Sequence, residues 1–526
     1  RDLRMSRGLG DVYKRQGLGG VVESADLFVM ENGATLQTTE TVTQGSPMKM
    51  EGKDGGCVEN LKDFIVETPV EGTLLTKKGD GWMKLNTVCP SLERLAINGG
   101  TVQCVACDRP AQTVEFISGT LYENTGSSYA IHVPEGGSGT WSLANRSTYN
   151  NKITGEGTLT IYCAVEHGNG WFATRTPVAV NLSLFTGTIN ATADMADSYP
   201  RFTLNTSSGM PDGTLNITAG VTVQNTGRTF RIGKLAGKGT LGGYASFAND
   251  GATGVNTWQV GCDDDFAWAG TVTANSKFEK VGSGKMTVSG VWDNTGEVAV
   301  KEGTLCLNDR SAENAMLGSG ELSVEDGAVL CGMGKLGNAS VTVERGGRLY
   351  SGTREGASSG TLDFSGKRLT VSTGGEVLFN VASKVRCTTL EGISSFSLRG
   401  TLKVSVREGL ELEAGDEFQL WVANRTALSS ACTLDLDSPG EGLEWDTSAL
   451  ENGILKVKTA TGITGVVSGE PVDCVVYTLD GARAGSFTCM PSEVGEYMER
   501  NGFRSGMYMV KMTQGQRTES RKVTVD

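Results

Sequence analysis

The feature that most constrains the fold is a short unit that recurs along the chain. It consists of an alternating strand, a turn built on Gly or Asn, a second short strand and then Gly-Thr-Leu. The copies of this ending are Gly72-Thr73-Leu74, Gly157-Thr158-Leu159, Gly213-Thr214-Leu215, Gly239-Thr240-Leu241, Gly303-Thr304-Leu305, Gly360-Thr361-Leu362 and Gly400-Thr401-Leu402. A unit of this kind buries its apolar face only by stacking on its neighbours. The sequence therefore predicts one long repetitive all-β body over residues 17–390.

Two copies of the unit align without a gap, with residue 77 on residue 280 and residue 100 on residue 303. Within the second copy every second side chain is apolar, which is the period of a strand with one buried and one wet face. The alternation predicts which side chains point inward and which point outward. The inward set is Met286, Val288, Val298 and Val300, and the outward set is Lys285, Thr287 and Lys301.

The aligned segments resemble the autotransporter-associated β-strand repeat. Its pattern is Lys, Gly, one residue and Gly, followed by a strand and a second strand that ends in Gly-Thr-Leu. The match is close over residues 278–307 and good over residues 75–102. This resemblance implies a right-handed parallel β-helix of an exported bacterial surface protein. Residues 391–458 resemble the terminal rungs and cap that close such an array, and a cap protects the last strand edges from pairing with other chains.

The end of the chain is expected to form a separate module. Residues 459–470 are rich in Gly, Thr and Ser and are expected to be a linker, and residues 471–526 carry strands with an Asp-Gly turn. The module resembles the type IX secretion C-terminal sorting domain of Bacteroidota, although Met507 stands where that pattern has Ile or Val. The residues that match the sorting signal are Tyr477, Leu479, Gly481, Gly506, Tyr508, Val510 and Lys511. The resemblance implies a small β-sandwich, export through an outer-membrane secretion machinery, and a secreted or outer-surface location.

Composition excludes several function classes. The net charge of −13 and the pI near 5.0 argue against nucleic acid as a partner, because phosphate contacts need clustered Lys and Arg. Only two histidines are present, which leaves little material for acid–base catalysis near neutral pH. No run of about 18 apolar residues is long enough to span a bilayer as a helix. We therefore expect no cofactor, no catalytic residues and no transmembrane span.

Two further features of the sequence are its cysteines and its first sixteen residues. Most of the twelve cysteines, including the lone Cys-x-x-Cys of Cys104 and Cys107, are expected to be small apolar core residues, here within a strand. Residues 1–16 look like translated sequencing adaptor and do not match the rest of the chain, so they are left out of the fold prediction. On that interpretation the true N-terminus is missing.

Two sets of residues are candidates for binding. Asp263, Asp264 and Asp265 form a solvated loop, bind Ca²⁺ or provide the carboxylates of a lyase or hydrolase site. Carboxylates are the ligands that Ca²⁺ prefers. Aromatic side chains either pack as core ladders or form a sugar-binding platform. The aromatic candidates are Trp141, Tyr149, Trp171, Phe172, Trp258 and Trp268.

The leading functional hypothesis is a non-enzymatic surface protein. Roughly fifteen rungs at about 4.8 Å each would give a stiff stalk or adhesive surface some 70 Å long, which contacts an extracellular glycan or a host surface. The alternative hypothesis is a polysaccharide-degrading β-helix enzyme, a lyase or a glycoside hydrolase. That alternative requires convergent carboxylates beside exposed aromatic side chains.

Overall fold

The structure of the 526-residue chain is a computed structural model. It describes residues 3–6, 27–123, 126–143, 149–162, 165–167, 170–172, 179–193, 201–243, 255–273, 276–308, 315–460, 470–515 and 517–525. The chain divides into two units. The first comprises residues 1–380, 388–404 and 421–435, and the second comprises residues 381–387, 405–420 and 436–526.

The regular structure of the described residues is almost all β, with 59% in strands and 2% in helices. Its helices are η1 (Leu450–Asn452) and α1 (Val494–Arg500). In chain order the strands are β1 (Leu3–Ser6), β2 (Phe28–Glu31), β3 (Ala34–Thr38), β4 (Val42–Gln44), β5 (Met48–Glu51), β6 (Gly56–Asn60), β7 (Phe64–Val66), β8 (Val70–Lys78), β9 (Trp82–Leu85), β10 (Leu92–Cys104), β11 (Thr113–Glu123), β12 (Ala130–Val133), β13 (Ser138–Leu143), β14 (Lys152–Gly155), β15 (Thr158–Tyr162), β16 (Val165–His167), β17 (Gly170–Phe172), β18 (Asn181–Phe185), β19 (Thr188–Thr192), β20 (Arg201–Leu204), β21 (Met210–Ile217), β22 (Thr222–Asn225), β23 (Thr229–Gly237), β24 (Thr240–Gly242), β25 (Asn256–Val260), β26 (Phe266–Trp268), β27 (Thr271–Val272), β28 (Ser276–Lys280), β29 (Lys285–Val288), β30 (Val298–Val300), β31 (Thr304–Asn308), β32 (Ala315–Met316), β33 (Leu322–Val324), β34 (Val329–Leu336), β35 (Ser340–Val343), β36 (Arg348–Ser351), β37 (Thr361–Val371), β38 (Glu376–Ser383), β39 (Arg386–Cys387), β40 (Thr389–Leu398), β41 (Thr401–Val406), β42 (Glu417–Gln419), β43 (Trp421–Ala423), β44 (Thr426–Leu428), β45 (Thr433–Leu436), β46 (Leu443–Asp446), β47 (Ile454–Thr459), β48 (Val472–Thr478), β49 (Arg483–Cys489), β50 (Gly506–Gln514) and β51 (Arg517–Val525).

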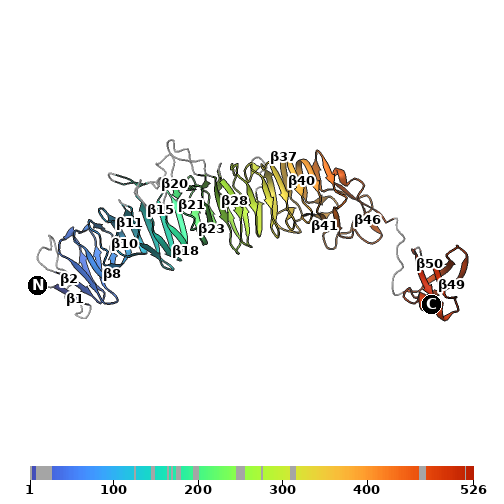
Figure 1. Cartoon of the computed structure of the whole chain (residues 1–526), viewed down its shortest axis with the longest axis horizontal. Helices are drawn as coiled ribbons and strands as arrows, with labels where there is room; N and C mark the ends of the chain where they lie inside the picture. Colours follow the sequence, from blue (N-terminus) through green and yellow to red (C-terminus); the bar gives the residue numbers. More distant parts are fainter. Residues whose placement is uncertain are drawn as a thin grey trace. The chain divides into compact units, whose positions relative to one another are not determined.

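Most of the first unit belongs to a parallel β-solenoid of about 15 turns, and this solenoid spans residues 28–406 (Figure 1). Equivalent strands of successive turns pair in parallel. In the first turns β2, β5 and β8 form one ladder, β3 and β6 continue into the second half of β8 as another, and β4, β7 and β9 form a third. The predicted parallel solenoid is confirmed, and its right-handedness stays a prediction. β1 also pairs in parallel with β2, although it lies in the segment left out of the fold prediction.

Alternate side chains of each strand fill the inside of the solenoid. Met286, Val288, Val298 and Val300 are all fully buried, as the alternation predicts. The outward residues Lys285, Thr287 and Lys301 are half-buried rather than fully exposed. Their stems are partly covered because the next turn lies only about 4.8 Å away along the stack.

Glycine at the corners lets successive turns approach this closely. Gly303 has a φ of 62°, which L side chains rarely adopt. A Cβ atom there would lie 2.5 Å from the carbonyl oxygen of Gly282, 2.6 Å from that of Ser283 and 2.7 Å from that of Gly284. The glycine of the recurring Gly-Thr-Leu is therefore explained by a close contact between the backbones of neighbouring turns.

The second unit contains antiparallel sheets. β42, β47 and β46 form a three-stranded sheet, and β49, β48, β50 and β51 form a four-stranded sheet in that order. Residues 391–458 are divided between the two units. We call the four-stranded sheet together with α1 the tail module (residues 470–525).

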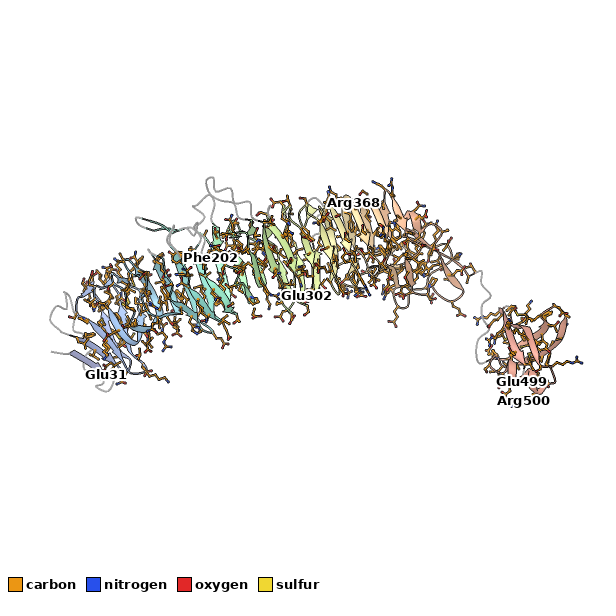
Figure 2. All side chains as sticks on the ribbon, viewed as in Figure 1. Glu31, Phe202, Glu302, Arg368, Glu499 and Arg500 are labelled. Atoms are coloured by element: carbon orange, nitrogen blue, oxygen red, sulfur yellow. The ribbon has the colours of Figure 1, made fainter. Side chains whose placement is uncertain are left out.

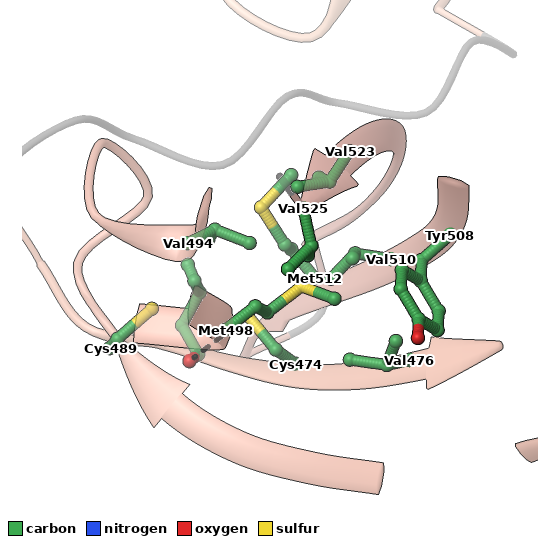
Figure 3. Close-up of a cluster of buried hydrophobic side chains, with 11 residues drawn as sticks. Cys474, Val476, Cys489, Val494, Met498, Tyr508, Val510, Met512, Val523 and Val525 are labelled. Carbon is green, nitrogen blue, oxygen red and sulfur yellow. Dashed lines mark hydrogen bonds between the residues drawn. The ribbon is translucent and has the colours of Figure 1, made fainter. Parts of the chain in front are cut away.

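The β-sandwich predicted for the tail module is not confirmed, because the described residues form small antiparallel sheets only. One face of its sheet is covered by α1, whose Val494 and Met498 pack with Val476, Val510 and other side chains of the sheet in a single cluster (Figure 3). Among the described residues of the module there is one sheet, and the helix provides the second layer that a sheet needs to bury its apolar face.

Candidate functional site

The strands that carry the sorting-signal residues lie at the centre of the tail module. β48 pairs with β49 on one side and with β50 on the other, and β51 completes the sheet beside β50. In the register of β48 and β50, Tyr477 lies opposite Met509, and Val475 lies opposite Lys511. The fold therefore brings the two halves of the motif together across one strand pair.

Some of the predicted signal residues face the core of the module. Val510 is fully buried, and Tyr508 is buried and donates a hydrogen bond of 2.9 Å from its hydroxyl to the carbonyl oxygen of Arg504. Both side chains belong to the cluster beneath α1 (Figure 3). These two residues hold the module together and are not available to a partner.

Other signal residues lie on the surface. Lys511 is exposed and Tyr477 is half-buried. Leu479, 64% exposed, stands at the turn after β48, where the amide of Gly481 donates to the carbonyl of Thr478 over 2.9 Å. Gly481 adopts a φ of 87° in this turn, and Gly506, which begins β50, adopts a φ of 154°. Both glycines are therefore explained by the backbone conformation at their positions.

The face of the sheet opposite α1 carries exposed apolar side chains. Met507 is 40% exposed and Met509 is 37% exposed. Met509 lies opposite Tyr477 on one side and opposite Lys522 on the other. We define the open face as Val475, Tyr477, Met507, Met509, Lys511 and Lys522. It has an apolar centre and two basic side chains, a composition that is typical of surfaces that bind a partner.

The sequence prediction missed the role of the two methionines. From the sequence, Met507 is only a departure from the family pattern, and Met509 has no predicted role. The strand period supplies the missing signal, since residues 507, 509 and 511 alternate with the buried Tyr508 and Val510.

The three aspartates of the candidate metal site have separate partners. Asp263 Oδ1 accepts from the Ser283 hydroxyl over 2.8 Å, and Asp265 Oδ1 accepts from the amide of Lys285 over 2.8 Å. Asp264 Oδ2 forms an ion pair of 2.7 Å with Lys234 Nζ. The bonds to Ser283 lower the pKa of Asp263. The three side chains thus tie neighbouring turns, and in the described part of the chain no three His, Cys, Asp or Glu side chains gather as a metal ion would require.

Most of the aromatic candidates belong to the core. Trp141, Tyr149, Trp258 and Trp268 are almost completely buried, which favours the core-ladder alternative over the sugar platform for these four. The side chains of Trp171 and Phe172 lie outside the described residues.

A different aromatic pair lies on the outer face of the solenoid. The rings of Trp82 and Tyr122 stack with centroids 5.4 Å apart and planes 4° apart, and both side chains are half-buried. They alternate with inward residues such as Met83 and Leu121, so they point out of the solenoid. Among the described residues, this outward-facing pair is the aromatic surface that most resembles the predicted sugar-binding platform.

The Cys-x-x-Cys segment forms a buried cluster with a carboxyl group. Cys104 ends β10, whereas Cys107 follows it outside the strand, and both are buried. A hydrogen bond between the two thiols lowers the pKa of Cys107 and, together with burial, raises that of Cys104. Glu123 lies on the next turn, is fully buried and accepts hydrogen bonds from the hydroxyls of Ser127 and Tyr129. Burial raises the pKa of Glu123 to about 8.

Comparison with known proteins gives no family for this chain, since no protein-family model and no curated protein matches it. Within the described residues, no helix has both the length and the apolar character needed to cross a membrane.

Proposed function

We propose that the chain is a non-enzymatic, surface-displayed or secreted β-solenoid protein that serves as a stalk or adhesive surface. Its tail module acts as a type IX secretion sorting domain, recognised by an outer-membrane secretion machinery of Bacteroidota. The solenoid supports the stalk role because about 15 turns spaced by about 4.8 Å extend for roughly 70 Å. A solenoid of non-local strand pairs also folds slowly and exposes strand edges, which favours export before aggregation.

The observation that carries the sorting proposal is the division of the motif between two faces of one sheet. Tyr508 and Val510 form the core, whereas Lys511, Met509 and Tyr477 lie on the open face. Recognition by a secretion partner would use the open face, where exposed side chains of the motif lie side by side on adjacent strands. Adjacent exposed apolar side chains flanked by polar groups are a feature of surfaces that a partner covers.

The test uses residues 466–526 fused to a periplasmic reporter in a host that has the type IX system. The intact tail is expected to send the reporter to the surface or the medium. Removing residues 506–511 would retain it, but that deletion also removes a central strand. A sharper variant is therefore Met509→Glu with Lys511→Glu, which changes the open face without touching the core.

Arg500→Glu is the matched control, because Arg500 lies on α1 (Figure 2) with its side chain 74% exposed. The helix covers the face of the sheet opposite the open face. Arg500→Glu makes the same change of charge as Lys511→Glu. Export lost in the open-face variant and kept in the control would support the proposal. If the reporter with the intact tail stays in the periplasm, the sorting role is wrong and the surface location then rests on the solenoid alone.

We propose that the adhesive surface includes the Trp82–Tyr122 pair and contacts an extracellular glycan. Aromatic rings supply large, rigid contact area at binding surfaces. The purified chain is expected to bind a polysaccharide array, with Trp82→Ala weakening the binding several-fold and Trp445→Ala, on β46, leaving it unchanged. Release of shorter sugars from the bound polysaccharide would favour the enzyme alternative over the proposal.

A further inference from the structure

Cys306 on β31 and Cys331 on β34 are direct partners in the parallel register of two adjacent turns. Register partners on adjacent strands point to the same face, with strands about 4.8 Å apart. That separation lies within the Cα distances of roughly 4.4–6.8 Å that a disulfide bridges. The backbone thus holds the two residues at a spacing that needs little movement for a sulfur–sulfur bond.

The two thiols already touch one another. The side chains of Cys306 and Cys331 share a hydrogen bond, so both sulfur atoms point into the same space. Both residues are almost completely buried in a small cluster with Tyr350 and Leu378, which occupy the same row on the following turns.

This row points out of the solenoid, because Cys306 alternates with the inward Leu305 and Leu307. A surface loop covers it. The sulfur of Cys306 lies 3.8 Å from the carbonyl oxygen of Thr353, and Glu355 of the same loop pairs with Arg348 over 2.9 Å. Opening of one loop, rather than of the solenoid core, would bring an oxidant to the pair.

We propose that Cys306 and Cys331 are joined by a disulfide bond that staples two neighbouring turns of the solenoid in the exported protein. The proposal rests on the proposed export, which takes the chain to an oxidising environment. The reaction is exchange with a low-molecular-weight or protein disulfide. Both thiols lose their hydrogen, one sulfur–sulfur bond forms, and the donor disulfide takes up two electrons and two protons to become two thiols.

One of the two thiols attacks the donor disulfide as its thiolate, and the neighbouring thiol then displaces the donor from the mixed disulfide.

The test uses the purified, folded full-length chain held with oxidised and reduced glutathione until its free thiol content is constant. It is then unfolded in an alkylating reagent, digested without reduction and mapped by mass spectrometry. We expect a linked peptide pair that contains Cys306 and Cys331 and is lighter by two hydrogen atoms than the sum of its parts. Cys57 is the internal control, a buried cysteine that is expected to be alkylated throughout.

Recovery of both cysteines as alkylated or glutathione-bearing peptides, or linkage of either one to another cysteine, would overturn the proposal. A second readout measures the effect of the bond on stability. Oxidation should raise the unfolding temperature of Cys57→Ala, which keeps the Cys306–Cys331 pair. In Cys306→Ala, which lacks the pair, the gain on oxidation should be smaller by several degrees. An equal gain in the two variants contradicts the staple. Because the oxidant is supplied in the tube, failure of the reporter export leaves these results unchanged.

Discussion

Two lysines sit inside the solenoid, at equivalent positions of the two aligned repeats. Lys77 and Lys280 are each fully buried, and each ammonium group donates to three backbone carbonyls. Lys77 Nζ reaches the oxygens of Lys78, Gly79 and Gly99 at 2.8, 2.7 and 3.3 Å. Lys280 Nζ reaches those of Val281, Gly282 and Glu302 at 2.9, 2.7 and 3.1 Å. The lysine of the repeat therefore ties the corner of its own turn to the corner of the next.

Replacing Lys280 by Met should leave these three carbonyls without a donor. An unpaired buried carbonyl costs about 1 kcal/mol or more, while loss of the ammonium relieves part of its desolvation. The net expectation at pH 7 is a loss of about 2 kcal/mol in the free energy of unfolding for Lys280→Met. The control Lys285→Met, on the outward side of β29, should change it by less than about 0.5 kcal/mol. Denaturant unfolding followed by circular dichroism measures both, and equal losses would contradict the corner role.

The titration of Lys280 makes the difference in unfolding free energy between the wild-type chain and Lys280→Met depend on pH. Burial lowers the pKa of Lys280 from 10.5 to about 8. Between these values the unfolded chain holds more protons than the folded chain, so the lysine's contribution to the free energy of unfolding rises with pH. Below pH 8 the cost of burying the charge is constant. The advantage of the wild-type chain over Lys280→Met should therefore grow between pH 8 and pH 10, and a constant difference would argue for a lysine that keeps its ordinary pKa.

Glu123 should show the opposite dependence. Burial raises its pKa from 4.5 to about 8, so its stabilising contribution is complete below 4.5 and is lost as the pH rises through 8. The neutral variant Glu123→Gln keeps the shape and removes the titration. We expect its unfolding temperature to gain on that of the wild-type chain between pH 5 and pH 9. Glu135→Gln, an exposed change on the loop after β12, should run parallel to the wild type; a parallel course for Glu123→Gln as well would show that Glu123 is ionised in the fold.

At the scale of the strand and its corner, a comparison of two glycines distinguishes the effect of steric contact from that of backbone strain. Gly303 and Gly327 have similar φ values of 62° and 74°, but a Cβ atom at Gly327 would meet nothing within 4 Å. Alanine at Gly327 should cost about 1 kcal/mol for the positive φ alone. At Gly303 it must also push the neighbouring turn away, so a loss of several kcal/mol is expected. Thermal unfolding of the two variants decides this, and equal effects would mean that the turns do not need the close approach at Gly303.

The strands were predictable from the sequence because a period of two is a local property, and the recurrence of one unit indicated parallel stacking. The buried lysine could also have been found by phase, since Lys280 shares the inward register of Phe278 in β28. The same phase places Trp258 with Val260 in the core. The second layer of the tail module was harder to predict, because strands alone do not say whether a sheet or a helix covers them. Its signal is the pair Val494 and Met498, spaced by one helical turn.

At the scale of the whole chain, the two units have separate cores. The core of the solenoid consists of inward side chains from parallel ladders that run from turn to turn. The core of the tail module is the cluster around Val476, Val510 and Met498 beneath α1 (Figure 3). A module of this size buries a limited apolar area, so we expect it to be the less stable of the two.

Deleting residues 466–526 should therefore leave the unfolding of the solenoid nearly unchanged. The buried cluster of the module consists of residues of the module itself, so its deletion takes no side chain out of the solenoid core. Calorimetry of the full chain should show a smaller transition that disappears on deletion, while the main transition moves by no more than a few degrees. The tail module made alone as residues 466–526 should keep a cooperative transition near that of the smaller one. Insoluble or molten material from the shortened chain would mean that the solenoid depends on the tail to fold, and a sorting module that is cut off after export could not then be its role.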